Sequence, residues 1–144
     1  MEDAAAGMLL VSLATMAMIV IAPVIFYLLT LQKILRLAGP NNRRMRPALV
    51  WLNLVPVFNL GWHLYTVIRI SDTLQATLGI PVGKSGRWLG ITAQLLLSGC
   101  LIPEYRGGFA LGALILWVAY WIKLSGYSAY MQRQLAQVMD SESE

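Results

Sequence analysis

The chain has 144 residues, of which 58% are hydrophobic and 12% are charged. This composition excludes an ordinary soluble domain and predicts one integral membrane domain covering residues 1–144. The net charge of +4 is assigned to Lys and Arg residues beside the membrane, so we expect membrane lipids and no nucleic acid as partners.

The first predicted element is the uncharged run of residues 7–31, which is long enough as a helix to cross a bilayer. It follows an acidic N-terminus and exceeds the apolar core of a signal peptide, so we predict an anchor that is retained. Pro23 predicts a bend in this helix, and Tyr27 is expected near the membrane interface.

A basic segment without acidic residues follows, in the loop of residues 32–46. The positive-inside rule places this loop in the cytoplasm and the N-terminus outside. We interpret its charges as orientation signals that face lipid, rather than as a site for a specific partner. The charged residues are Lys33, Arg36, Arg43, Arg44 and Arg46.

The next predicted element is a helix over residues 47–70 that is broken at Pro56. Proline removes a backbone donor and clashes with the preceding turn, which predicts a kink or an end. Asn53 and Asn59 flank the break, and their amides can bond to the freed backbone groups. Past residue 70, apolar residues at helical spacing predict a continuation along the membrane surface to residue 78.

Two paths remain open for this broken helix. Its length supports a single crossing of the membrane. A re-entrant hairpin instead would leave ten of the eleven Lys and Arg residues in the cytoplasm, with Arg106 outside. We favour the hairpin because of this distribution, although re-entrant backbone must be covered by protein or water.

Two further transmembrane helices are predicted, over residues 87–103 and residues 108–123, and the second has an amphipathic extension to residue 139. The last helix ends in aromatic residues, which are expected to form a belt at the membrane interface. The expected belt consists of Trp117, Tyr120 and Trp121.

Small residues predict where these helices contact others. Gly90, Gln94 and Ser98 are spaced four residues apart and so form one stripe on a helix. Such a stripe lets a second helix approach closely and offers Gln94 a hydrogen-bond partner. Gly108 and Gly112 form a GxxxG pattern, which predicts a contact within the chain or with a second copy.

The candidate site is the set of polar residues inside the apolar segments: Asn53, Asn59, His63 and Gln94, together with the break at Pro56. His63 follows Asn59 by four residues and shares its helix face, which makes it the candidate for a ligand or proton site; we favour a structural role near the interface, where water is available. No carboxylate lies within the apolar runs, and with one cysteine and one histidine we expect neither a metal site nor a cofactor. We therefore do not expect an enzyme.

Short motifs in the central part carry a resemblance. They are Trp51, Leu54, Pro56-Val57-Phe58-Asn59 and, further on, Ile70-Ser71-Asp72-Thr73-Leu74 with Leu78-Gly79. In these motifs, over residues 47–105, the chain resembles small uncharacterised bacterial multi-pass membrane proteins with a Trp-rich segment that contains Pro-x-x-Asn. The resemblance implies a bacterial plasma-membrane protein and transfers no catalytic residue.

The expected fold is thus an all-α integral membrane protein with three transmembrane helices and one broken or re-entrant helix, arranged as a four-helix bundle. Three functions are compatible with the sequence. The first is a non-catalytic accessory or assembly subunit that packs against a larger membrane complex. The second is a small homo-oligomeric channel or carrier with its path along the candidate polar residues, and the third is a protein that binds a lipid or quinone.

Overall fold

The computed structural model describes residues 2–55, 58–81 and 83–143, and only the backbone of residues 2–6. Most of the described residues are helical and none of them is in a strand, so the predicted all-α class is confirmed. Four main helices are joined by one short helix and two 3-10 segments. The elements are α1 (Glu2–Leu37), α2 (Gly39–Asn42), η1 (Pro47–Leu54), α3 (Phe58–Leu78), α4 (Arg87–Gly99), η2 (Pro103–Tyr105) and α5 (Arg106–Glu142).

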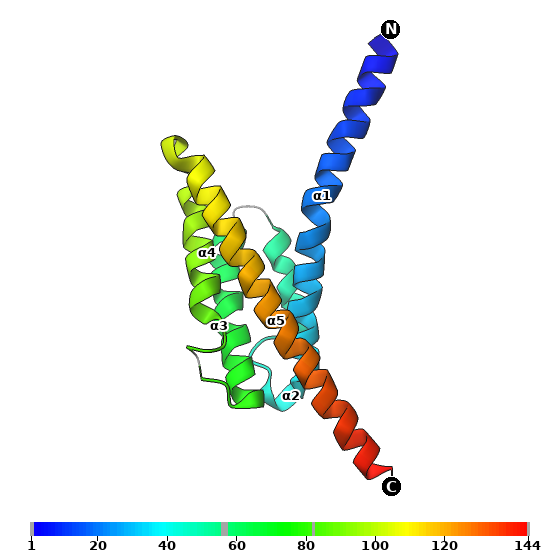
Figure 1. Cartoon of the computed structure of the whole chain (residues 1–144), viewed down its shortest axis with the longest axis vertical. Coiled ribbons are helices and arrows are strands. Elements are labelled where there is room, and N and C mark those ends of the chain that lie inside the picture. Colours follow the sequence, from blue (N-terminus) through cyan, green and yellow to red (C-terminus); the bar gives the residue numbers. More distant parts are fainter. Residues whose placement is uncertain (1, 56–57, 82, 144) are drawn as a thin grey trace.

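Two segments are long and apolar enough to cross a membrane, as judged by length and composition among the described residues. They are Gly7–Leu37, within α1, and Pro103–Glu142, which comprises η2 and α5. No residue is buried in the most apolar window of the first segment, because the N-terminal half of α1 stands apart from the other helices (Figure 1). Both segments are therefore candidates for helices that cross a membrane.

The helices α1, α3 and α5 run in one direction and α4 runs in the other (Figure 1). One end of the bundle therefore holds the start of α1, the end of α4 and η2. The opposite end, here called the basic end, holds the C-terminal end of α1, α2 and the start of α4. The basic residues of the loop 32–46 lie at this end. Arg43 is half-buried, and the other four are exposed: Lys33, Arg36, Arg44 and Arg46.

The central segment is a hairpin of η1 and α3 rather than one continuous helix. The two elements are antiparallel, as shown by a 3.1 Å hydrogen bond from the Arg44 amide to Thr73 Oγ1 and one of 3.2 Å from Asn53 Nδ2 to Thr66 Oγ1. The 3-10 helix ends at Leu54 and α3 begins at Phe58. Pro56, where we predicted the break, lies outside the described residues.

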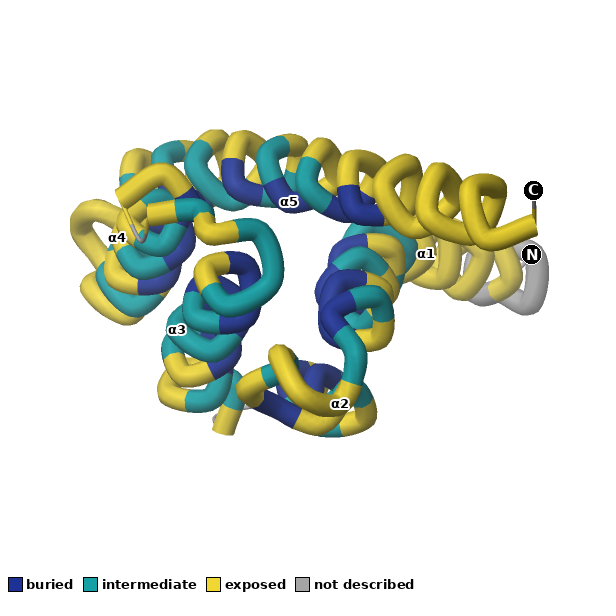
Figure 2. Tube along the Cα trace, turned by 90° about the horizontal axis from the view of Figure 1, so that it is seen from below, coloured by how far each residue is buried: buried dark blue, intermediate teal, exposed yellow. Residues whose placement is uncertain are grey.

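Large apolar side chains fill the bundle toward the basic end. The buried parts of the helices face the centre of the bundle (Figure 2). The helix α5 lies across α1 and α4 on one side of this centre, and the hairpin lies on the opposite side. Because apolar burial is the main favourable term between these elements, this core fixes their arrangement. Its fully buried members include Leu31 and Ile34 of α1, Val67, Ile70 and Leu74 of α3, and Leu124 of α5.

The glycines that were predicted to lie at helix contacts differ in how closely they approach another helix. A Cβ added to Gly90 would lie 2.7 Å from Val67 Cγ1 and 3.2 Å from Tyr120 Cε1, so α4 packs closely against α3 and α5. A Cβ on Gly112 would lie 3.2 Å from Leu96 Cδ1, whereas one on Gly108 would meet nothing within 4 Å. Of the GxxxG pair, only Gly112 therefore approaches another helix of the described chain.

The three aromatic residues of the expected belt on α5 contact α1. Tyr120 is 1% exposed, and Trp121 donates a 3.1 Å hydrogen bond to Thr30 Oγ1. Tyr27 of α1, expected at the interface, is 2% exposed and makes an edge-to-face contact with Trp117 at 5.1 Å. The prediction from aromatic composition missed these contacts because composition does not show which face of a helix meets a neighbour.

Candidate functional site

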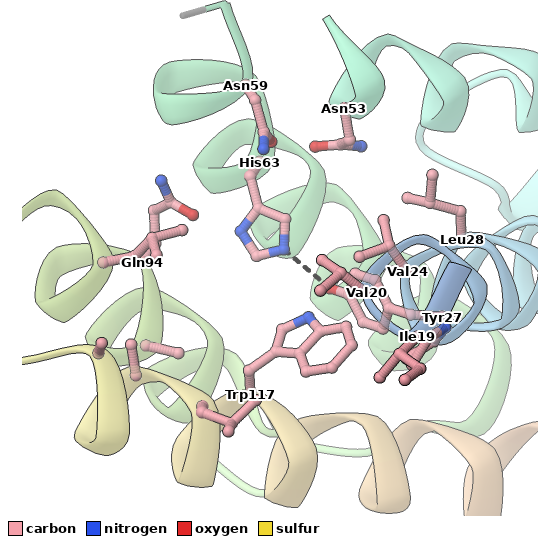
Figure 3. Close-up of a pocket in the computed structure, with 16 residues that line it drawn as sticks. Ile19, Val20, Val24, Tyr27, Leu28, Asn53, Asn59, His63, Gln94 and Trp117 are labelled. Carbon is pink, nitrogen blue, oxygen red and sulfur yellow. Dashed lines mark hydrogen bonds between the residues drawn. The ribbon is translucent and has the colours of Figure 1, made fainter. Parts of the chain in front are cut away.

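A cavity of about 590 Å³ lies between α1, the hairpin, α4 and α5. It occupies the part of the bundle from which the N-terminal half of α1 diverges (Figures 1 and 3). Four of the five residues in the predicted polar site line it: Asn53, Asn59, His63 and Gln94. The fifth, Pro56, lies outside the described residues.

These four side chains, here called the polar wall, come from three elements. Asn53 belongs to η1, Asn59 and His63 to α3, and Gln94 to α4 (Figure 3). Asn53, His63 and Gln94 are 4–7% exposed, and Asn59 is half-buried. The proline-containing break thus divides residues that contribute to one wall.

Asn53 is held in one orientation by two hydrogen bonds. Its Nδ2 donates to the Val50 carbonyl at 2.7 Å and to Thr66 Oγ1 at 3.2 Å. Its Oδ1 is buried and has no hydrogen-bond partner among the described residues. Turning the amide over would break both bonds, so Asn53 presents an acceptor that is not used.

His63 is bonded to a residue that the sequence argument did not include. The hydroxyl of Tyr27 lies 2.9 Å from His63 Nε2, and Nδ1 of the ring is buried without a partner in the described structure. If Tyr27 donates to Nε2, Nδ1 carries the proton and is a donor; if Nε2 donates to Tyr27, Nδ1 is an acceptor. His63 can therefore adapt to either kind of hydrogen-bonding group.

The remaining two polar residues differ in their bonding. Gln94 Nε2 donates to the Leu60 carbonyl at 3.2 Å and so ties α4 to α3. Asn59 Oδ1 is buried and, like Asn53 Oδ1, has no partner among the described residues. A buried polar atom without a partner costs about 1–3 kcal/mol, so the polar wall is suited to a ligand that bonds to it.

The other sides of the cavity are apolar. Aliphatic side chains of α1, α4 and α5 line them, and Trp117 adds an indole ring. None of the described residues that line the cavity is Asp, Glu, Lys or Arg. The apolar lining includes Ile19, Val20, Val24, Leu97, Ala110 and Leu114.

The polar wall has little capacity for a metal ion. It offers one imidazole and three amides, whereas zinc favours several thiolates or imidazoles, and calcium and magnesium favour carboxylates. The described residues also contain no group of three His, Cys, Asp or Glu side chains placed to hold an ion. An organic ligand fits this donor set better.

Tyr27 and Trp117 are the site residues that the sequence argument missed. Both were interpreted as interfacial aromatics, since each precedes a lysine. The available signal was position: Tyr27 lies six residues before Lys33, which is more than one helical turn into the apolar run. A hydroxyl at that depth needs a partner, and His63 provides it.

We find no match to this chain among protein-family models, curated proteins or solved structures. The functional argument therefore rests on the geometry of the cavity.

Proposed function

We propose that the protein is a small, non-catalytic integral membrane protein that holds an amphipathic, lipid-like molecule in the cavity. One observation carries this proposal: among the described residues, the cavity lining is uncharged, with apolar sides and one polar wall on which three buried atoms lack hydrogen-bond partners, Asn53 Oδ1, Asn59 Oδ1 and His63 Nδ1. A molecule with a polar head and an apolar tail matches both surfaces, because its head can give the buried polar atoms partners and its tail can pack against the apolar side chains.

The proposed setting is the bacterial plasma membrane, with the N-terminus outside and the loop of residues 32–46 in the cytoplasm. In this topology α1, α4 and α5 cross the membrane, and the hairpin of η1 and α3 enters and leaves on the cytoplasmic side. Support comes from the basic end, which gathers the Lys and Arg residues of the loop and is opposite η2 and Arg106 (Figure 1).

The depth of the cavity also supports a ligand that comes from the bilayer. On α5 its lining residues, from Ala110 to Trp117, lie between Arg106 and Lys123. That uncharged stretch is about 26 Å long as a helix, close to the thickness of the hydrocarbon layer. A ligand dissolved in the bilayer can therefore reach the cavity without passing through water.

A channel through a single chain has less support. The polar residues are confined to one wall, and the bundle between this wall and the basic end is filled by core side chains with no exposed surface, including Leu31, Ile70 and Leu124. Atoms packed at the density of a protein interior leave no continuous path for an ion or solute.

An accessory subunit is the second candidate function. The observation that favours it is the N-terminal half of α1, where large apolar residues from Met8 to Met18 are at least 63% exposed and stand clear of the bundle (Figure 1). Extraction of a tagged chain in a mild detergent tests this candidate. Other subunits that co-purify at a fixed ratio would support it, whereas the chain alone or a ring of its own copies would oppose it.

The ligand proposal is tested by native mass spectrometry of the chain extracted from its membrane. We expect a retained amphiphile on the wild type and its loss in Ala110→Phe, since Ala110 lines the cavity and a phenyl ring there fills part of it. Leu111→Phe is the matched control, because Leu111 is 64% exposed on the same helix and does not line the cavity. Equal retention by the two variants would contradict the proposal.

A further inference from the structure

We infer that the polar wall selects a ligand whose headgroup is uncharged and carries at least one hydroxyl group. This inference rests on the proposed function and specifies the class of ligand. It follows from two properties of the wall, which are the fixed acceptor on Asn53 and the lack of charged residues around the cavity.

The first property sets the hydrogen-bonding role of the ligand. Asn53 Oδ1 accepts no hydrogen bond in the described structure, and the amide nitrogen is already used by Val50 and Thr66. The group that pairs with this oxygen must be a donor. An ester, an ether or a ketone offers only acceptors, so a lipid with only such groups leaves Asn53 Oδ1 without a partner.

The second property excludes charged headgroups. A phosphate brings negative charge and acceptor oxygens, and it is usually bound by Arg, Lys or a cluster of backbone amides. The described cavity lining offers no Lys or Arg, and two of the three atoms without partners are amide oxygens. A phosphate placed there would face other acceptors and lose its hydration without compensation.

A hydroxyl can pair with the third atom, His63 Nδ1, whether this nitrogen is a donor or an acceptor. It is donor and acceptor at once, so it can bond to His63 Nδ1 whichever tautomer the Tyr27 contact selects. Two classes of membrane molecule carry such a group on an apolar tail. They are diacylglycerols, with a free alcohol, and isoprenoid hydroquinones, with phenolic hydroxyls.

The test compares probes that differ only at the headgroup, in competition on the purified full-length protein, with occupancy measured by native mass spectrometry. Dioleoylglycerol is compared with its acetate ester and with dioleoylphosphatidic acid; an isoprenoid hydroquinone is compared with its dimethyl ether. We expect the hydroxyl form to bind at least about tenfold more tightly than its capped or phosphorylated counterpart, a difference of about 1.4 kcal/mol. The pair that shows this preference identifies which of the two classes binds.

Variants test whether the preference for the hydroxyl probe comes from the polar wall. Asn53→Leu should remove this preference, but the change also breaks two hydrogen bonds within the hairpin. Asn59→Leu is therefore used as well, since no hydrogen bond of Asn59 Oδ1 is lost, and it should reduce the preference severalfold. Thr92→Leu, at an exposed position of α4 outside the cavity, is the matched control and should leave the preference unchanged.

The outcomes separate this inference from the proposed function. Equal affinity for hydroxyl and capped probes, or a preference for phosphatidic acid, overturns the inferred selectivity. If probe binding is nevertheless lost in Ala110→Phe, the proposal of a ligand in the cavity is still supported. Binding of every probe that is insensitive to Ala110→Phe overturns both. A preference that persists in Asn53→Leu and Asn59→Leu also overturns the inference, because it then arises elsewhere.

Discussion

The hydroxyl of Tyr27 and Nε2 of His63 lie 2.9 Å apart, although 36 positions separate the two residues in the chain. The bond joins α1 to the hairpin of η1 and α3 at the edge of the cavity. Both side chains are less than a tenth exposed, so neither can exchange this partner for bulk water.

Removal of that hydroxyl is therefore expected to destabilise the fold. Tyr27→Phe keeps the ring contact with Trp117 but leaves His63 Nε2 buried without a partner. We expect the free energy of unfolding to fall by about 1–3 kcal/mol, measured by denaturant titration in mixed micelles. Tyr105→Phe, at a tyrosine that is 65% exposed, is the control, and a loss no larger than in this control would contradict the prediction.

Close packing at Gly90 gives a second prediction. Gly90→Ala places a methyl group 2.7 Å from Val67 Cγ1, so either Val67 must leave its rotamer or α4 must move away from α3. Overpacking of this kind costs about 1–3 kcal/mol, to be measured in the same unfolding assay. Gly126→Ala meets nothing within 4 Å and should be neutral or slightly stabilising, because alanine favours a helix.

A double variant tests whether the cost at Gly90 comes from that contact. Val67→Ala removes both methyl groups that approach the added Cβ. We expect Gly90→Ala with Val67→Ala to lose less stability than the sum of the two single variants. Simple additivity would show that the strain lies elsewhere.

The membrane topology is tested with single cysteines in a Cys100→Ser background. Asn42, Lys84 and Glu104 are exposed, and each is replaced by cysteine in turn. With a re-entrant hairpin, Lys84→Cys and Asn42→Cys react with an impermeant maleimide only after the membrane is opened, whereas Glu104→Cys reacts in intact cells. Labelling of Lys84→Cys from outside would instead mean that the broken helix crosses the membrane once.

The ion pair between Asp72 and Arg87 should contribute little. Its atoms lie 3.4 Å apart, and the side chains are 31% and 24% exposed, respectively. Pairs this accessible typically stabilise a protein by less than about 1 kcal/mol, so Asp72→Asn should change the free energy of unfolding by no more than that. A loss above about 2 kcal/mol would show that the pair acts as a buried one.

Local rules account for the parts of the fold that were predicted. Apolar composition indicates helices because a bilayer leaves no other solution for an open chain, and most of the described residues are helical. The end of η1 at Leu54 and the start of α3 at Phe58 lie on either side of Pro56, where a missing donor disfavours continuous helix. These features depend on neighbouring residues only.

The contacts that build the cavity could not be derived in the same way. Tyr27 meets His63 because α1 and α3 pack with one particular rotation, which depends on the whole core. Likewise, Gly112 approaches Leu96 of α4 whereas Gly108 meets no neighbouring side chain, which depends on how α5 packs against α4. Polar residues within apolar runs could be listed from the sequence, but whether they share one wall depends on tertiary packing.

The length of α5 has a mechanical consequence. It is one uninterrupted helix from Arg106 to Glu142, and Trp117 of the cavity lies on the same rod as the exposed C-terminal part. From Trp117 to the end of the helix is about 38 Å at 1.5 Å per residue, so a tilt of about 5° at the cavity moves the far end by about 3 Å. A ligand in the cavity that tilted α5 would therefore also move the C-terminal part of the helix.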